Sequence, residues 1–326
     1  MSNSSVAPSS FEFTVFSDLG SLRYLFFCLC LLLFMTIISA NVVIILSVCL
    51  EKSLHQPMYI FICCLSLNSV YGSVGFFPRF LMDLLSDAHL ISRPFCFTQM
   101  YVIYTYVGHE VSLLTVMAYD RLVAICQPLH YHSKMTFWAV LSLLVFTVLY
   151  PVFILSYFFY LSISLSLCGN ALKHIYCTNW SILLLSCVDK VVNNITGQCL
   201  FIAVTTIFLP LVFVLYSYLR ILLVCRRSVS EFRGKALQTC LPHIVTFINF
   251  CISIFCEVLL SQYKVNEVNP FVNVVLSLEF LIIPPISNPI VYGLNLPQIR
   301  EVIVRFKMEL FPNNFKKHKA TSKWKP

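Results

Sequence analysis

The residues best suited to chemistry in this chain are a few charged side chains that lie within long uncharged stretches. Glu110 and Glu279 each interrupt such a stretch, and Asp120 is followed directly by Arg121. Charged groups are costly in an apolar medium, so each is a candidate for a functional role. An acid–arginine pair at a helix end can hold that end closed and release the arginine to a partner. Alternatively, the arginine extends to solvent beside a helix-end acid, and the spacing leaves both interpretations open.

Other titratable residues favour simpler interpretations. Glu279 could be protonated, paired across helices or exposed to water, whereas Glu257 lies nearer the end of its apolar stretch and is expected to be solvated. His243 is expected to be a buried histidine with a hydrogen bond. No group of His, Cys and acidic residues has the spacing of a zinc site. Ser, Cys and His occur without a nucleophile–base arrangement, so we expect neither an enzyme nor a bound metal or cofactor.

The elements that must position these residues are long apolar helices. Hydrophobic residues make up 59% of the 326 residues and charged residues 11%, against about 25% charged in soluble domains. Lipid permits helices or closed barrels, and barrel strands alternate apolar and polar residues, whereas these runs are continuous. A helix needs about 20 residues to cross the hydrocarbon core. Seven spans are predicted, at about residues 23–50, 57–80, 94–126, 135–160, 191–225, 235–260 and 269–294.

The distribution of basic residues predicts the orientation of the spans. Sixteen of the 22 Lys and Arg residues fall in the connections after spans one, three and five and in the C-terminal tail. Basic loops stay in the cytoplasm, which puts the N-terminus outside. The net charge of +8 then indicates a tail near an anionic leaflet rather than a nucleic-acid site. We expect an extracellular tail over residues 1–22, a membrane domain over 23–295, and a cytoplasmic helix and basic tail over 296–326.

Four cysteines and a glycosylation sequon fall on the predicted outer side. The cysteines are Cys96, Cys168, Cys177 and Cys187. Disulfides persist in this compartment, and any pairing would fasten the long loop over residues 161–190 as a structured lid. Four cysteines permit three pairings, among which the residues alone do not choose. The sequon begins at Asn3.

A transporter or channel is the rival functional class, because such proteins also carry acids and kinked helices inside the membrane. Transporters often contain inverted repeats. This chain has no internal repeat, and seven spans do not divide into equal halves. A ligand-activated receptor is therefore favoured.

Short motifs stand in a fixed order at the ends of the predicted spans. They are LHQPMYIF at Leu54–Phe61, MAYDRLVAICQPLHY at Met117–Tyr131, Ser217-Tyr218, KALQTCLPH at Lys235–His243 and PPISNPIVYGLN at Pro284–Asn295. With these motifs the chain resembles rhodopsin-like G-protein-coupled receptors, and specifically odorant receptors, over roughly residues 20 to 310. The resemblance implies an all-α bundle of seven transmembrane helices, N-terminus outside and C-terminus cytoplasmic, with a short amphipathic helix after the seventh span.

The resemblance also implies roles for individual residues. Disulfides would join Cys96 to Cys177 and Cys168 to Cys187. Residues implied in activation and G-protein coupling are Asp120, Arg121, Tyr218, His243, Asn288, Pro289 and Tyr292. Arg121 would engage the G protein once the cytoplasmic helix ends part, with Asp120 restraining it at rest. The implied setting is the plasma membrane, and the implied partners are a small-molecule odorant and a heterotrimeric G protein of the olfactory stimulatory type, which raises cyclic AMP.

Some positions depart from the family pattern. Ser69 stands where most members have an Asp, so whether Glu110 shares a sodium site stays open. Leu122 replaces the Tyr that usually follows the Asp-Arg pair, Ala40 replaces a Gly in the first span, and Cys251 replaces an aromatic residue near the pocket floor. These departures concern the details of activation.

By the family's geometry a ligand pocket lies beneath the lid, between helices three, five, six and seven. The matching residues are Ile103, Tyr104, Val107, Gly108, Ile202, Thr206, Cys251, Phe255, Val258 and Leu278. This mostly apolar set suits a small, largely uncharged molecule with one hydrogen-bonding group, although each residue could instead pack between helices. Ile103 stands where amine receptors have an acid, which disfavours amine ligands, but Glu279 could meet a cation. The seventh span has no Lys for a retinal Schiff base.

Overall fold

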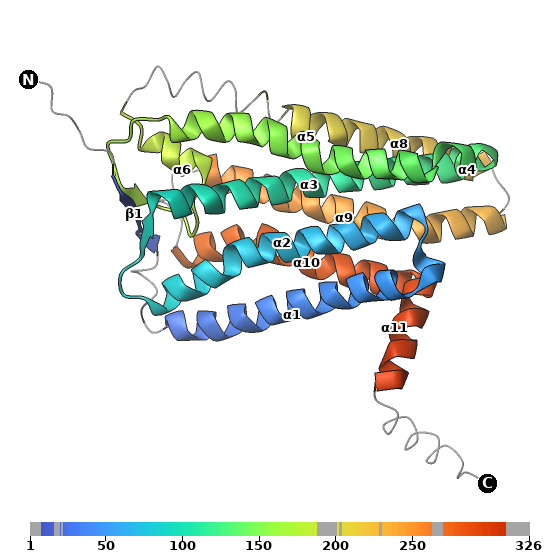
Figure 1. Ribbon diagram of the computed structural model, residues 1–326, viewed down its shortest axis with the longest axis horizontal. Coiled ribbons are helices and arrows are strands. Elements are labelled where there is room, and N and C mark those ends of the chain that lie inside the picture. Colours follow the sequence, from blue (N-terminus) through green and yellow to red (C-terminus); the bar gives the residue numbers. More distant parts are fainter. Residues whose placement is uncertain are drawn as a thin grey trace, which may run out of the picture.

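The computed structural model describes residues 8–15, 20, 22–187, 201, 204–227, 230–262 and 270–310. They fold into a bundle of long helices with a small sheet at one end (Figure 1). The seven long helices of this described part are α1 (Leu22–Leu50), α2 (Pro57–Leu85), α3 (Arg93–Cys126), α5 (Phe137–Ile163), α8 (Leu209–Arg227), α9 (Ser230–Gln262) and α10 (Pro270–Asn295). The shorter helices are α4 (Tyr131–Lys134), α6 (Asn179–Leu184), α11 (Pro297–Leu310), the π-helical turn Val204–Phe208 and the 3-10 turns Lys52–Leu54 and Pro128–His130.

Several helices differ in length from the expected spans, because local hydrogen bonds set where each helix begins and ends. α2 runs to Leu85, where the backbone N–H of Ser86 still bonds to the carbonyl of Met82. α5 begins at Phe137 because the Thr136 hydroxyl accepts the Ala139 N–H at 3.3 Å, which is a typical helix N-cap. The start of the fifth expected span, residues 191–200, lies outside the described residues.

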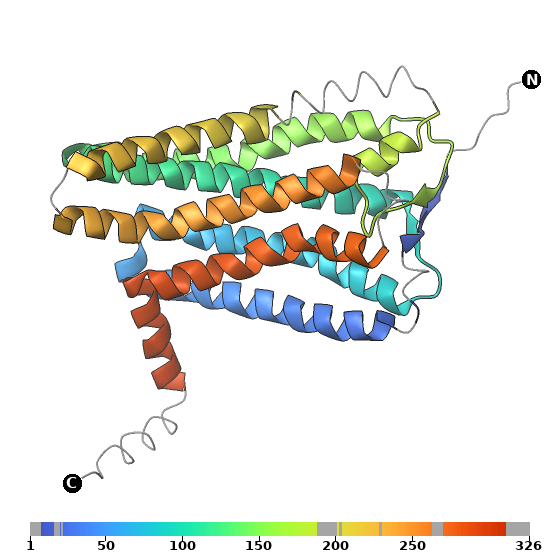
Figure 2. The same ribbon diagram turned by 180° about the vertical axis from the view of Figure 1, so that it is seen from behind.

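The outside of the bundle is apolar, as a protein in lipid requires. Five described helices are long and apolar enough to cross a membrane: α1, α2, α5, α9 and α8 with its preceding turn. On α1 and α5, large side chains such as Leu32 (66% exposed) and Phe153 (71% exposed) face away from the bundle. An exposed apolar face of this extent is unsuited to water. α3 and α10, which carry Glu110 and Glu279, pack against α2 and α9 in the same bundle (Figure 2).

A three-stranded sheet covers one end of the bundle, hereafter the sheet end, and the N-terminal segment supplies its central strand. β1 (Ser10–Phe13) pairs antiparallel with β2 (Leu90–Ser92) and parallel with β3 (Ala171–Leu172). Successive residues of a strand face opposite sides, and Phe11 and Phe13 of β1 are buried in the core. The segment expected to be a tail thus forms part of the fold.

Two disulfides fasten the segment after α5 over the sheet end. Cys96, near the start of α3, is bonded to Cys177, and Cys168 is bonded to Cys187 within the segment. This is the pairing that the resemblance implies. The described residues 164–187, hereafter the lid, therefore have one covalent attachment to α3 and one internal closure.

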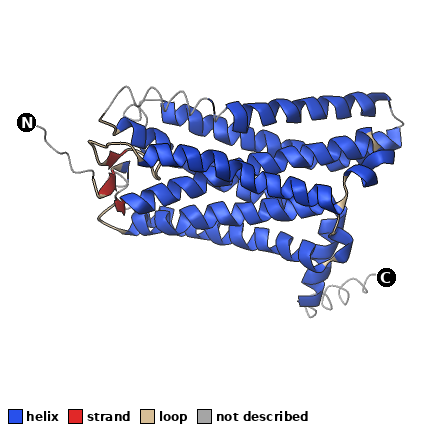
Figure 3. Cartoon of the chain, turned by 45° about the horizontal axis from the view of Figure 1, so that its top comes forward, coloured by secondary structure: helices blue, strands red, loops and turns tan. Residues whose placement is uncertain are grey.

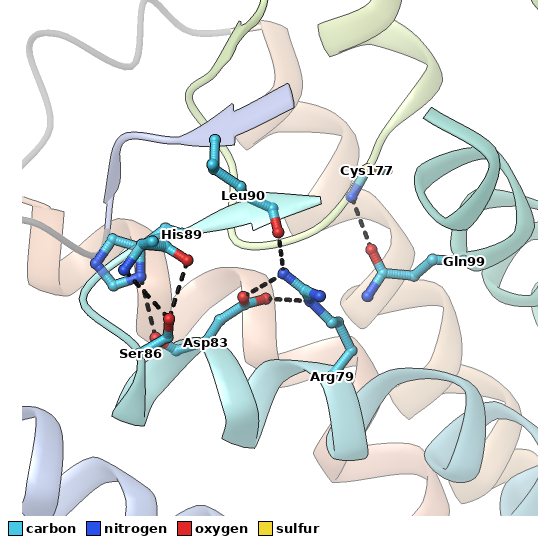
Figure 4. Close-up of polar contacts among 8 residues, drawn as sticks. Arg79, Asp83, Ser86, His89, Leu90, Gln99 and Cys177 are labelled. Carbon is cyan, nitrogen blue, oxygen red and sulfur yellow. Dashed lines mark hydrogen bonds and ion pairs between the residues drawn. The ribbon is translucent and has the colours of Figure 1, made fainter. Parts of the chain in front are cut away.

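Polar contacts add further attachments between the sheet end and α2 and α3 (Figure 4). Arg79 donates to both carboxylate oxygens of Asp83, at 2.9 and 2.7 Å, and to the carbonyl of Leu90 in β2 at 2.6 Å. The bidentate pair orients the guanidinium so that it can bond to β2, and this bond attaches the strand to the end of α2. In the lid, the backbone N–H of Cys177 donates to Gln99 Oε1 at 3.2 Å. The lid is thus positioned on α3 beside the disulfide.

α11 leaves the opposite end of the bundle at a steep angle to the other helices (Figures 1 and 3). Ile299 and Val302 are buried against the bundle, whereas Arg300 and Arg305 are exposed, so the helix is amphipathic. Arg305 also contacts Glu51 after α1. The expected helix after the seventh span is present, and the end from which it leaves, hereafter the Arg121 end, is opposite the sheet.

Replacing both Cys168 and Cys187 by Ser is expected to destabilise the protein. The disulfide closes a loop with a sequence separation of 19, and losing such a constraint costs about 3 kcal/mol. We expect the midpoint of thermal unfolding of the purified protein to fall by about 5 °C or more. Cys28→Ser, which removes an exposed free thiol, serves as the control. An unchanged midpoint in the double variant would contradict a stabilising role for this disulfide.

Acidification is expected to loosen the lid through His174. This residue is buried, and its Nδ1 has no hydrogen-bond partner among the described residues. Burial lowers the pKa of His174 below its usual value of 6.5, so the folded lid binds a proton less readily than the unfolded chain. The folded lid, which holds His174 neutral, therefore has its full stability above about pH 6.5 and loses stability as the pH falls below that value.

Protection of the lid amides against hydrogen exchange, expressed relative to the intrinsic exchange rate at each pH, should therefore be lower at about pH 5 than at about pH 7. His174→Gln should abolish this difference, whereas His130→Gln, at an exposed position near the Arg121 end, should retain it. Equal pH dependence in wild type and His174→Gln would show that another group is responsible.

Candidate functional site

Glu110 is a buried carboxylate that joins three helices. It lies in α3 with 1% of its surface exposed. One carboxylate oxygen accepts the side-chain N–H of Asn68 in α2 at 2.7 Å, and the other accepts that of Asn288 in α10 at 2.8 Å. A buried carboxylate is tolerated when its oxygens are hydrogen-bonded, and two amide donors meet that need here. Two of the predicted residues, Glu110 and Asn288, are thus brought together.

Ser69 does not replace the missing carboxylate of the family pattern. Its hydroxyl is buried and donates to the carbonyl of Leu65, one turn earlier in α2, at 3.1 Å. The neighbouring Asn68 provides the contact with Glu110 instead. Glu110 therefore faces a neutral amide donor here instead of the second acid of the family pattern, which makes the local charge less negative by one unit.

One backbone hydrogen bond is missing from α10, the seventh long helix, and a side chain from α1 replaces it. Pro289 has no N–H, so the carbonyl of Pro285, four residues earlier, lacks its helical partner. Asn41 donates its amide to this carbonyl at 2.9 Å and is itself fully buried. Asn288, next to the proline, turns its side chain to Glu110 instead. The segment around the predicted hinge at Asn288 and Pro289 therefore accepts a hydrogen bond from α1 and donates one to α3.

Asp120 and Arg121 form a closed ion pair at the Arg121 end. Arg121 Nε donates to Asp120 Oδ2 at 2.9 Å, and a guanidinium Nη makes a second contact with the same oxygen. Tyr131 donates its hydroxyl to the other oxygen of Asp120 at 2.8 Å. Asp120 is completely buried, and Arg121 is 13% exposed. The carboxylate thus has partners on both oxygens, which favours restraint of Arg121 over extension into solvent.

Two further polar contacts join α8, α9 and α10 near the same end. The Tyr218 hydroxyl contacts His243 Nδ1, and the Thr246 and Tyr292 hydroxyls are 2.9 Å apart. His243 is fully buried, as expected for a histidine with a hydrogen bond. No group of three or more potential ligands for a metal ion occurs within the described ranges. The hydrogen bonds thus gather the predicted activation residues into three groups: Asp120 with Arg121, Tyr218 and Tyr292 with His243 through Thr246, and Asn288 with Glu110.

Glu257 is not solvated, contrary to expectation. The lid residue Tyr176 donates its hydroxyl to Glu257 Oε1, and Ser253 donates to Glu279 Oε1 at 2.8 Å. The disulfide at Cys177 holds the preceding Tyr176 over α9 and α10. Glu257 was expected in solvent because it lies near the end of its apolar stretch, and that position does not reveal that the lid folds over it. The position of Tyr176 beside a disulfide cysteine is the one sequence feature that could have indicated this contact.

The predicted pocket residues fall into separate groups. Ile103, Gly108 and Leu278 are buried, and Tyr104, Val107, Thr206 and Cys251 are partly buried. The prediction for Phe255 is wrong, since its side chain is 62% exposed on the outside of the bundle. It lies two residues, about 200° of helical turn, from the fully buried Ser253, so the two face opposite directions. Ile202 and the side chain of Val258 lie outside the described residues.

Gly108 has a packing role that its place in the predicted pocket did not suggest. A Cβ at this position would lie 2.7 Å from Cβ of Pro151, which is too close for two carbon atoms. The glycine therefore permits the close approach of α3 and α5. A small apolar pocket lies nearer the sheet end between the same two helices, lined by Met100, Tyr101, Tyr104, Leu155, Phe158 and Phe159. Tyr104 is the predicted residue that lines it.

Two glycosylation sequons have different outcomes in the structure: one lies outside the described residues and the other is buried. Asn3, the predicted site, lies outside the described residues. A second sequon at Asn179 is in α6 of the lid, where the side chain is buried and accepts the Ser162 hydroxyl at 2.8 Å. A buried asparagine of this kind cannot carry a glycan without unfolding of the lid.

Comparison with known proteins identifies the family. The olfactory receptor family model matches residues 27–310. Human olfactory receptor 51L1 is 35% identical over 84% of this chain and 86% of its own length, and human olfactory receptor 56A4 is 33% identical over 93% and 96%. The solved structure of squid rhodopsin superimposes with a TM-score of 0.71 at 15% identity, covering 89% of this chain and 87% of that chain, which shows the shared fold.

The fold and the relatives agree. Seven long helices, a disulfide-bonded lid at one end and a closed acid–arginine pair at the other accompany a family match over most of the chain. The chain is a multi-pass plasma-membrane receptor rather than an enzyme, and it belongs to the olfactory receptor family.

Proposed function

We propose that this receptor binds a small odorant in the half of the bundle beneath the lid and activates a heterotrimeric G protein of the olfactory stimulatory type, which raises cyclic AMP. The observation that carries this function is the restraint of Arg121 by Asp120, whose other oxygen accepts the Tyr131 hydroxyl, at the end opposite the lid. A restrained cation at one end and a closed lid at the other suit a protein that receives a ligand at one side and a partner at the other.

The sheet end is the outer side in this proposal. The excess of basic residues in the connections at the Arg121 end supports it, because such loops stay in the cytoplasm. The two disulfides at the sheet end support it as well, because disulfides persist in the oxidising compartment. The division into an outer tail over residues 1–22, a membrane domain over 23–295 and a cytoplasmic helix and tail over 296–326 follows from the same orientation.

Activation would exchange one set of polar contacts for another. At rest, Asp120 holds Arg121, and the Tyr218–His243 contact holds α8 against α9. Movement of α9 away from α3 would free space at the Arg121 end for a segment of the G protein. Tyr218 and Tyr292 would then support the open arrangement, with Asn288 and Pro289 as the hinge in α10. Each interaction is individually modest, which suits an equilibrium that a ligand can shift.

The ligand would lie between α3, α9 and α10 and the preceding turn of α8. Ile103, Tyr104, Val107, Thr206, Cys251 and Leu278 are the described residues that we retain for this site. Their apolar surface favours a small organic molecule, because burial of such a ligand is driven by its apolar area. Tyr104 and Thr206 supply hydroxyl groups for orientation.

Arg121→Ala is expected to abolish the odorant-dependent rise in cyclic AMP without loss of the protein from the cell surface. Asp120→Asn is expected to raise the signal without odorant, because the neutral amide releases the arginine. Both are measured in cells by cyclic AMP and surface labelling, with Arg300→Ala at an exposed position of α11 as the control. A response of Arg121→Ala equal to that of wild type would contradict the role given to Arg121.

Glu110→Ala is expected to destabilise the bundle. It would remove the acceptor of the Asn288 amide and one of the two acceptors of the Asn68 amide, which also donates to the Tyr106 carbonyl, at a cost of about 1–3 kcal/mol for each unpaired N–H. Thermal unfolding of the purified receptor measures the effect. Ser112→Ala in the same helix is the control, since that hydroxyl bonds to the Gly108 carbonyl one turn earlier in its own helix. Equal stabilities of the two variants would rule out the three-helix bridge as a stabilising contact.

A further inference from the structure

Two partly buried acids on neighbouring helices lie beneath the lid without enough partners. Glu257 in α9 and Glu279 in α10 each have one bonded oxygen, to Tyr176 and Ser253 respectively. The Oε2 atom of each is buried and has no hydrogen-bond partner among the described residues. Ser253, one turn before Glu257 on the same face of α9, contacts Glu279 of α10, so the two carboxylates lie on facing sides of these helices. Buried acceptors without donors and paired like charges both raise the energy of the resting protein.

An aromatic cluster lies beside Glu257 on the lid side. Tyr176, which is 2% exposed, packs its ring at 6.0 Å from Phe76 and 6.1 Å from Phe280. Tyr176 bonds to Glu257 and its ring contacts Phe280 of α10, which brings the rings and the acids into one region. Aromatic faces attract organic cations, and carboxylates supply the opposite charge. This combination of groups selects a compact cation over a neutral molecule.

We propose that the receptor recognises a small organic ammonium ion, a protonated alkylamine, through Glu257 and Glu279. An alkylammonium group has three N–H donors, of which two would serve the unpartnered Oε2 atoms. Its positive charge would remove the repulsion between the acids. The Tyr176 bond to Glu257 uses the other oxygen, so the lid can stay closed over the bound cation.

This inference rests on the proposed function, because it names the ligand class of the same receptor. It also modifies the expectation from the sequence. Ile103 in place of an acid on α3 disfavoured amines, and Glu279 was the one acid expected within reach. The structure adds Glu257, which the lid brings inward, and so moves the acidic contact from α3 to α9 and α10.

Binding to the purified receptor tests the ligand class. The probes are n-alkylamines from butyl to octyl, each matched with the alcohol and the carboxylic acid of the same chain length. Ligand-dependent shifts of the thermal unfolding midpoint report binding without a G protein. We expect the amines to stabilise the receptor at concentrations at least about 10-fold lower than the matched alcohols, and the carboxylic acids to have no effect. Equal effects of amines and alcohols would overturn the proposal.

Conservative variants locate the contact. Glu257→Gln and Glu279→Gln should each weaken amine binding by about 10-fold or more, and should leave alcohol binding unchanged, because they remove charge and keep shape. Glu301→Gln, at an exposed position of α11, is the matched control and should bind amines like wild type. Amine affinities unchanged in both pocket variants would overturn the proposal. If a variant does not fold, the comparison of amines with alcohols on wild type still decides.

Parallel cyclic AMP measurements separate this inference from the proposed function. Amine binding that depends on both acids but gives no signal would refute the proposed coupling and uphold the ligand class. Activation by other odorants that depends on Arg121, with no binding of any amine, would refute the ligand class and uphold the receptor function.

Discussion

A polar side chain inside a lipid-embedded bundle finds no water, so it must find its partners on other helices. This constraint decides most of the long-range polar contacts in the structure. Glu110 on α3 accepts from Asn68 on α2 and Asn288 on α10, and Asn41 on α1 donates to the carbonyl that Pro289 leaves free on α10. Because hydrophobic attraction between helices is weak where lipid is equally apolar, such contacts and close packing specify which helices meet.

The same contacts divide the molecule into a fixed half and an adjustable half. The sheet end is held by two disulfides, by three strands and by the Arg79–Asp83 pair, which together restrict movement. At the Arg121 end, single hydrogen bonds hold α8, α9 and α10. The proline that interrupts the backbone ladder of α10 follows Asn288, which contacts Glu110 between the two halves. Because the sheet end resists movement, a displacement under the lid would be taken up at the helix ends near Arg121.

Much of the fold could be predicted from the sequence, because a bilayer makes helix formation depend on local composition. Long uncharged runs gave seven helices, and the motif series gave the family. The contacts of the candidate site could be predicted only in part. The pairing of the adjacent Asp120 and Arg121 was implied by the family resemblance, although their spacing alone left it open. Asn68 and Glu110, in contrast, are 42 positions apart and meet because of the relative rotation of α2 and α3. Phe255 was misplaced for the same reason, since its direction depends on the rotation of α9.

The sequence by itself determined that this chain is an olfactory receptor of seven membrane helices, because apolar length and motif order are local properties of the chain. The tertiary structure decided which acids lie beneath the lid. Glu257 appeared to belong to the solvated rim until the disulfide at Cys177 placed Tyr176 over it. Likewise, the N-terminal segment became a strand because Phe11 and Phe13 find a buried surface between β2 and β3. Both outcomes depend on segments far apart in the chain, whose meeting is fixed by packing and covalent closure.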